Sequence, residues 1–118
     1  MQKHKENYLM ENHRNNYGLT ERDMKTFLQI FKRYPSVKEV KLFGSRAKGN
    51  FKPGSDIDLA VMNKEVDENE LLHLRSEIDE SSLPYRIDLV NYNNLTRTDF
   101  IDHINRVGVL FFKSEIHD

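Results

Sequence analysis

Cysteine is absent from the 118 residues, which excludes a disulfide framework and a thiolate metal site. No apolar run approaches the roughly 20 residues needed to span a membrane, and the N-terminus lacks the apolar core of a signal peptide. A surplus of positive charge is also missing. The net charge of −1 and the pI near 6.5 argue against a dedicated nucleic-acid binder, which usually carries a basic surface. We therefore expect a soluble, cytoplasmic protein with no membrane partner and no direct nucleic-acid partner.

The length is sufficient for one hydrophobic core but leaves no room for a second. Residues 1–18 are polar and rich in Asn, with too little apolar surface to offset the entropy of ordering them. The sequence therefore predicts a flexible N-terminal arm over residues 1–18 and a single domain over residues 19–118.

The most informative stretch of the chain covers residues 41–62. An apolar run ends at Gly44-Ser45, and ten residues later Asp56-Ile57-Asp58 opens a second apolar run. Alternate residues of a strand share one face, so Asp56 and Asp58 are expected to point the same way. Two such carboxylates repel each other unless a cation lies between them. Mg²⁺ binds one or two carboxylates and completes its shell with water and phosphate oxygens.

Gly44 and Ser45 can hold that phosphate, because glycine lets the backbone approach closely while N–H groups and the Ser hydroxyl donate hydrogen bonds. Residues 45–48 are predicted to form a short helix whose N-terminus faces the phosphates. Arg46 and Lys48 could reach phosphate oxygens from this helix, or could simply be exposed to solvent.

A third carboxylate, Asp88, lies inside the apolar run of residues 85–91, where an unpaired charge would be costly. A two-metal nucleotidyl-transfer site requires such a group, either to share an ion or to activate the attacking hydroxyl. Taken alone, an Asp-x-Asp pair is usually a solvated strand end, and Gly-Ser is an ordinary turn. The combination of all three features favours a metal–triphosphate site.

The hydrophobic pattern predicts an α/β (or α+β) fold with a mixed sheet of three to four strands and flanking helices. A helix is expected to begin at Thr20 and end before Pro35, and two more are expected over residues 66–80 and 96–107. Strands are expected over residues 37–43, 56–62 and 85–91, with the first two antiparallel and the last two parallel. The apolar run of residues 109–112 fits either an edge strand or a hydrophobic contact for a partner.

The arrangement of these residues resembles the signature of the DNA polymerase β-like nucleotidyltransferase superfamily. It consists of the Gly-Ser pair, the ten-residue spacing, the Asp-x-Asp pair and the later Asp88. The short length and the phrase SSLPYRIDLVNY resemble its minimal nucleotidyltransferase branch. One departure is visible: the family often reads Gly-Ser-x-Ala-Arg-Gly, and Lys48 takes the Arg position. Lysine keeps the charge but lacks the planar fork that binds phosphate through two hydrogen bonds.

The resemblance implies transfer of AMP from ATP with Mg²⁺, most simply two ions. Asp56, Asp58 and Asp88 would be the catalytic and metal-binding residues, and the nucleotide would be bound by Gly44, Ser45, Arg46 and Lys48. The resemblance also implies a small helical partner protein with a HEPN fold, for which the chain would be the antitoxin. The acceptor of the AMP group would then be a hydroxyl of that partner, expected to be a Tyr. Two alternatives remain open at this point: an antitoxin with a weak site that neutralises its partner by contact, and a small-molecule adenylyltransferase.

Overall fold

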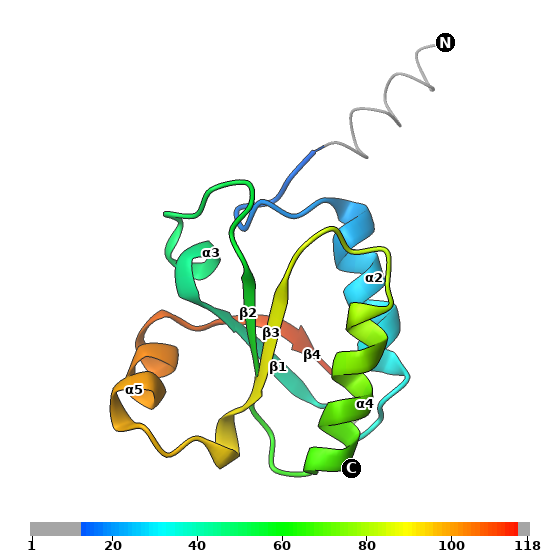
Figure 1. Cartoon of the computed structure of the whole chain (residues 1–118), viewed down its shortest axis with the longest axis vertical. Coiled ribbons are helices and arrows are strands. Elements are labelled where there is room, and N and C mark those ends of the chain that lie inside the picture. Colours follow the sequence, from blue (N-terminus) through cyan, green and yellow to red (C-terminus); the bar gives the residue numbers. More distant parts are fainter. Residues whose placement is uncertain (1–12, 116–118) are drawn as a thin grey trace.

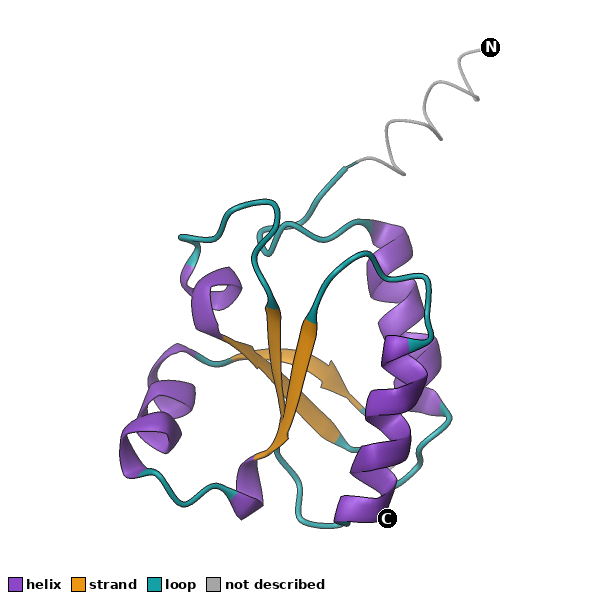
Figure 2. Cartoon of the chain, in the orientation of Figure 1, coloured by secondary structure: helices purple, strands orange, loops and turns teal. Residues whose placement is uncertain are grey.

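A four-stranded mixed sheet forms the centre of the computed structural model, which describes residues 13–115 (Figures 1 and 2). The strand order is β3-β2-β1-β4, with β1 antiparallel to both β2 and β4, and β2 parallel to β3. The strands are β1 (Glu39–Phe43), β2 (Ile57–Val61), β3 (Ile87–Asn91) and β4 (Val109–Lys113). The predicted mixed sheet and its strand directions are confirmed.

Helices flank the sheet on both faces (Figure 1). The helices are α2 (Glu21–Lys32), α3 (Gly44–Lys48), α4 (Glu68–Asp79) and α5 (Thr98–Val107), with a 3-10 turn at Tyr92–Asn94. Helices α2 and α4 lie together on one side of the sheet, whereas α3 and α5 lie on the other. None of the helices within residues 13–115 has the length and hydrophobicity to cross a lipid bilayer.

Helix α2 begins where the sequence indicates, at a capping box. The Asp23 N–H donates to the Thr20 hydroxyl, and the Thr20 N–H donates to the Asp23 carboxylate, each at 3.0 Å. In α2, the apolar residues Met24, Phe27, Leu28 and Phe31 recur at i, i+3, i+4 and i+7, the spacing of one helix face. Phe27 and Phe31 are buried, whereas Leu28 is 41% exposed.

The alternation of side chains along β2 separates two environments. Ile57, Leu59 and Val61 are fully buried in the main core beneath α2 and α4. Ala60 points to the opposite face and joins Phe43 and Ile104 in a smaller cluster near α5. The Asp58 side chain lies two residues before Ala60 on the same strand, so it points to the face that carries the smaller core.

Residues 13–18 belong to the domain, so the expected boundary after residue 18 does not hold for them. The Arg14 guanidinium donates to the Gly18 carbonyl at 2.8 Å and to the Tyr85 hydroxyl at 2.9 Å. Tyr17 packs against the main core. Side-chain and main-chain hydrogen bonds across this segment offset the ordering entropy that its polar composition suggested. Residues 1–12 of the expected arm lie outside the described residues.

The apolar run of residues 109–112 forms an edge strand. Of the two alternatives for this run, an edge strand or a hydrophobic contact for a partner, the structure therefore shows the first. Strand β4 pairs with β1, and Phe112 is 8% exposed. The Phe111 and Phe112 rings each lie 5.1 Å from an aromatic ring of α2. Leu110 differs from these two phenylalanines, since it is 54% exposed.

Candidate functional site

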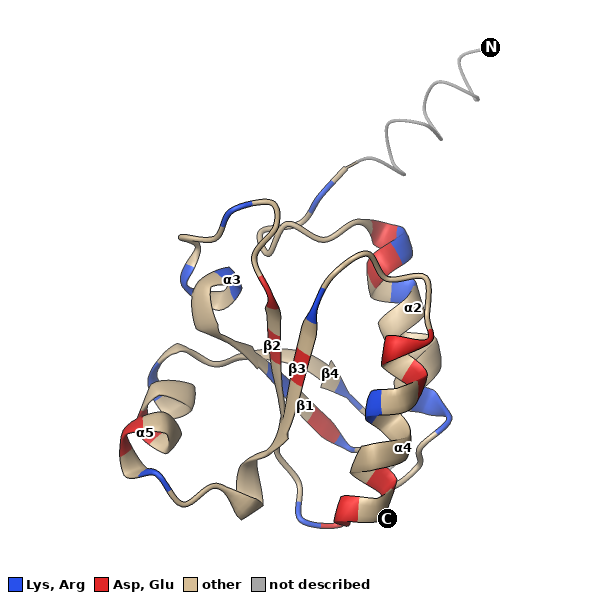
Figure 3. Cartoon of the chain, in the orientation of Figure 1, with Lys and Arg blue, Asp and Glu red and all other residues tan. Residues whose placement is uncertain are grey.

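Two carboxylates lie directly opposite each other on adjacent strands. Asp58 of β2 is the register partner of Asp88 of β3, and neighbouring strands are about 4.8 Å apart. Asp56 precedes β2 by one residue, so acidic residues gather where β2 and β3 begin (Figure 3). The fold thus places Asp58 and Asp88 side by side, and Asp56 lies near enough for its charge to act on Asp58.

Repulsion between these groups changes the chemistry of Asp58. Burial, the Asp88 and Asp56 charges, and a side-chain hydrogen bond with Asp88 together raise the pKa of Asp58 to about 6. Asp58 is half-buried, while Asp88 is exposed. The pair is therefore most stable when a proton or a cation offsets one of its negative charges.

Gly44 is required by its contact with Asp58. Its φ of 73° lies in the left-handed region, and a Cβ at this position would lie 2.2 Å from the Asp58 carboxylate oxygen. Phe43, the preceding residue, is the register partner of Asp58. The backbone of the Gly-Ser turn therefore lies directly against the Asp58 carboxylate.

Arg46 has a different position from the one the sequence predicted. Its side chain is 1% exposed and donates hydrogen bonds to the carbonyl oxygens of Tyr17, Pro53 and Ser55, at 2.8–3.1 Å. The guanidinium also lies 5.0 Å from the ring centroids of both Phe51 and Tyr85. The expected phosphate contact is therefore corrected: Arg46 anchors the loop before Asp56 to residues 13–18.

The remaining predicted nucleotide ligands keep accessible positions on α3. Ser45 lies in the first turn and is half-buried, and Lys48 in the last turn is exposed. Nothing in their positions assigns a contact, so their role stays a prediction.

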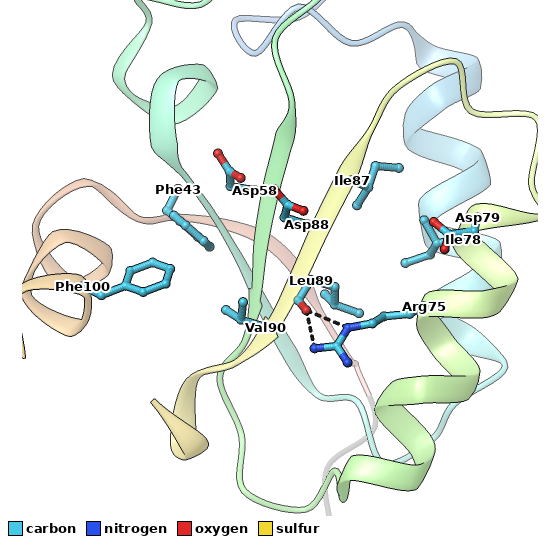
Figure 4. A pocket seen from close by; sticks show the side chains of 10 residues that line it. All are labelled: Phe43, Asp58, Arg75, Ile78, Asp79, Ile87, Asp88, Leu89, Val90 and Phe100. Atoms are coloured by element: carbon cyan, nitrogen blue, oxygen red, sulfur yellow. Dashed lines mark hydrogen bonds between the residues drawn. The ribbon is translucent and has the colours of Figure 1, made fainter. Parts of the chain in front are cut away.

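A cleft of about 420 Å³ joins the carboxylates to residues that the sequence did not single out (Figure 4). On the side of α5 it is lined by Phe43 and Phe100, whose ring centroids lie 5.5 Å apart. On the side of α4 it is lined by Arg75 and Ile78, among others. The available signal for Arg75 was its position four residues after Leu71 and directly after Leu74, at the border of the apolar face of this helix.

Among residues 13–115, no three His, Cys, Asp or Glu side chains are placed to hold a metal ion by themselves. The pair of Asp58 and Asp88 nevertheless supplies two hard oxygen ligands on adjacent strands. Mg²⁺ typically uses one or two carboxylates and takes its other ligands from water and substrate phosphates, so this donor set fits Mg²⁺.

The family model described as "Polymerase beta, Nucleotidyltransferase" matches residues 25–117. The chain belongs to this family. The match includes every residue of the nucleotidyltransferase signature, from the Gly-Ser turn to Asp88. The family expected from the sequence is confirmed.

A relative from Haemophilus influenzae, named "Probable protein adenylyltransferase MntA", is 39% identical over 74 residues. The match covers 62% of this chain and 64% of that protein.

Solved structures share the fold of this nucleotidyltransferase chain. A chain of a toxin–antitoxin crystal structure with AMP-PNP has a TM-score of 0.63 and 22% identity, covering 79% of this chain and 75% of its own. A chain of the complex between a tri-AMPylated Shewanella oneidensis HEPN toxin and an MNT antitoxin has a TM-score of 0.55 and 19% identity, covering 78% of this chain and 71% of its own. At these identities the likeness shows the fold alone.

We predict that Arg46→Met lowers the free energy of unfolding by at least about 2 kcal/mol, because the carbonyl groups of Tyr17, Pro53 and Ser55 lose a buried charged donor. Lys48→Met makes a similar change at an exposed position of the same helix and should stay within about 0.5 kcal/mol of the parent. Urea denaturation measures both. Equal midpoints for the two variants would show that the guanidinium does not anchor the loop.

Gly44→Ala and Gly49→Ala form a second matched pair, since both glycines have positive φ and only Gly44 touches another group. Each substitution should cost about 1–2 kcal/mol of left-handed backbone strain. Gly44→Ala should lose a further 1–3 kcal/mol or so from its collision with Asp58. Thermal unfolding of both variants compares them, and equal losses would contradict the close contact at Asp58.

The raised pKa of Asp58 predicts a pH dependence with a definite sign. The folded state binds this proton more tightly than the unfolded state, so the contribution to stability is complete below pH 3.8 and is lost as the pH rises through about 6. Asp58→Asn mimics the neutral form. We expect this variant to be more stable than the parent at neutral pH, with the difference shrinking as the pH falls to 3.8.

Asp102→Asn is the control for this titration, because Asp102 is paired with Arg106 on exposed α5 and should give no gain in stability at neutral pH. Urea unfolding midpoints across the pH range provide the measurement. An Asp58→Asn variant that is no more stable than the parent at neutral pH would refute the destabilisation of the charged Asp58 carboxylate by burial and by its acidic neighbours.

Proposed function

We propose that this chain transfers AMP from ATP to a tyrosine hydroxyl group of a HEPN-domain partner protein and thereby acts as its antitoxin. The observation that carries the proposal is the facing pair of Asp58 and Asp88 beside the Gly44 turn. Such a pair suits a cation–triphosphate complex, since the bound cation offsets the charges that repel each other. The name of the Haemophilus relative supports protein adenylylation, and the solved AMPylated toxin complex supports the class of partner.

Asp56, Asp58 and Asp88 would hold the Mg²⁺ ions, of which we propose two. When bound, Mg²⁺ neutralises negative charge on the triphosphate and on the leaving pyrophosphate. The turn at Gly44-Ser45 would bind the β- and γ-phosphates through N–H groups and the Ser45 hydroxyl, with the Lys48 ammonium within reach of the same charges.

In the transfer step, the acceptor oxygen would form a bond to the α-phosphorus of ATP as the bond from that phosphorus to the pyrophosphate oxygen breaks. The hydroxyl proton would pass to a carboxylate oxygen of Asp88, the most exposed of the three acids. The products are an AMP ester of the acceptor and pyrophosphate. Positioning and charge neutralisation therefore account for most of the proposed catalysis.

One observation favours the second candidate, an antitoxin that neutralises its partner by contact. Arg46 is committed to the loop, and Lys48 replaces the arginine common in the family, so the site has fewer strong phosphate ligands than its sequence signature suggested. The two candidates differ in a single product, the AMP ester.

Intact-mass measurement of the co-expressed HEPN-domain partner, with ATP and Mg²⁺ supplied, tests the proposal. The parent chain should add one or more AMP groups, and Asp58→Asn should slow the addition at least about 100-fold through lost transition-state stabilisation. Asp102→Asn removes a carboxylate of α5 and should leave the rate unchanged. A partner that is bound and inhibited but never modified would favour the contact-only antitoxin instead.

A further inference from the structure

Strand β3 is an open edge of the sheet, next to the carboxylates. It pairs with β2 on one side, and no strand within residues 13–115 pairs with its other side. The opposite edge, β4, lies two strands away from Asp58. Edge strands present unpaired N–H and C=O groups that another extended segment can join.

The main-chain groups of Ile87 point away from the sheet. The Ile57 N–H donates to the Arg86 carbonyl at 2.9 Å, so Arg86 faces β2. Main-chain directions alternate along a strand, and Ile87 and Leu89 therefore face outward. Arg75 confirms the direction for Leu89, because its guanidinium reaches from α4 and donates to the Leu89 carbonyl at 2.8 and 3.0 Å (Figure 4).

The cleft follows this edge instead of one face of the sheet. Residues 87–90 all line it, and since successive side chains of a strand point to opposite faces, the cleft must pass across the edge of β3. Asp88 and Phe100 lie on one side of the edge, whereas Ile78 and Asp79 lie on the other (Figure 4). An extended peptide needs both sides, because its own side chains alternate in the same way.

We propose that the acceptor docks as an extended segment on the outer edge of β3, exchanging main-chain hydrogen bonds with Ile87 and placing a hydroxyl-bearing side chain beside Asp88. The proposal rests on the proposed function, since it names how the acceptor of that reaction is held. In an antiparallel pairing, the residue opposite Ile87 exchanges both main-chain hydrogen bonds, and the next residue lies opposite Asp88. Their Cβ atoms are then about 4.5–5.5 Å apart on the same face.

Arg75 limits how far this pairing extends. In the free chain it already occupies the Leu89 carbonyl, the group that a longer docked strand would use next. The outward main-chain N–H and C=O of Ile87 lie one residue before Asp88. A short docked segment therefore pairs with β3 only there, beside the reacting carboxylates. The same guanidinium protects the edge against association with unrelated strands.

Residue-resolved amide hydrogen exchange tests the docking. The chain is measured alone and saturated with the HEPN-domain partner, in the absence of ATP. The Ile87 amide should slow at least about tenfold in the complex, which corresponds to one new hydrogen bond. The Lys113 amide is the control on the opposite edge, because the Ser114 N–H faces β1 and Lys113 alternates outward; its exchange should not change.

A matched pair of variants gives a second measurement. Ile87→Pro removes the outward N–H, which an edge strand tolerates, along with part of the packing of the Ile87 side chain, and should weaken partner binding about tenfold. Ile87→Val keeps the N–H and should bind as the parent does. Leu110→Ser changes an exposed apolar residue of β4 and should also bind unchanged.

The outcomes separate this proposal from the proposed function. Protection of Ile87 without AMP transfer supports the docking and overturns the function. Transfer of AMP with unchanged exchange at Ile87 overturns the docking and leaves the function standing. If the Lys113 amide is protected in place of the Ile87 amide, the docking is overturned in favour of the opposite edge, β4. If protection of Ile87 grows with the concentration of the chain alone, it is overturned in favour of pairing with a second copy of this chain.

Discussion

Repulsion between Asp58 and Asp88 is the constraint on which the site depends. The parallel register of β2 and β3 fixes the two carboxylates opposite each other, so the fold itself maintains the repulsion. Burial of Asp58, together with this repulsion, raises the pKa of Asp58 to about 6. A protein that keeps two like charges in this position loses some stability in the absence of a cation, and this loss is the physical reason to expect a cation-dependent activity here.

Two further contacts hold the geometry around this pair. Gly44 lets the main chain pass against the Asp58 carboxylate, where any side chain would collide. Arg46 fixes the Ser55 carbonyl immediately before Asp56 and ties that loop to Tyr17. Burial lowers the pKa of Arg46, and so does the Arg14 charge, while Tyr85, Asp23 and Asp56 offset this only in part. Its charge therefore serves the structure of the site and leaves nucleotide binding to other groups.

The two faces of the sheet divide stability from function. The face under α2 and α4 holds the larger core, with Ile57, Leu59 and Val61 fully buried. The other face carries the carboxylates and a smaller core beside α5, and the cleft runs from this face across the edge of β3. Since one strand supplies residues to both faces, a shift of β2 by one residue would bury Asp58 and expose its neighbours. The large core thus fixes the register on which the acidic pair depends.

The sequence by itself determined the local elements and the identity of the acidic residues. The periodic apolar positions of α2, the Thr20 cap and the Asp-x-Asp spacing are local patterns, and local patterns follow from backbone geometry alone. The mixed sheet could also be predicted, because short and long connections favour antiparallel and parallel pairing respectively.

Tertiary structure alone decided which charged residues remain accessible. Arg46 and Lys48 are two residues apart on one short helix and look equivalent in sequence, yet one is buried and the other exposed. The difference arises from segments distant in the chain, Tyr17 and Tyr85, which close around Arg46. The defined conformation of residues 13–18 and the cleft across the edge of β3 depend on such long-range contacts too, and no local sequence pattern encodes them.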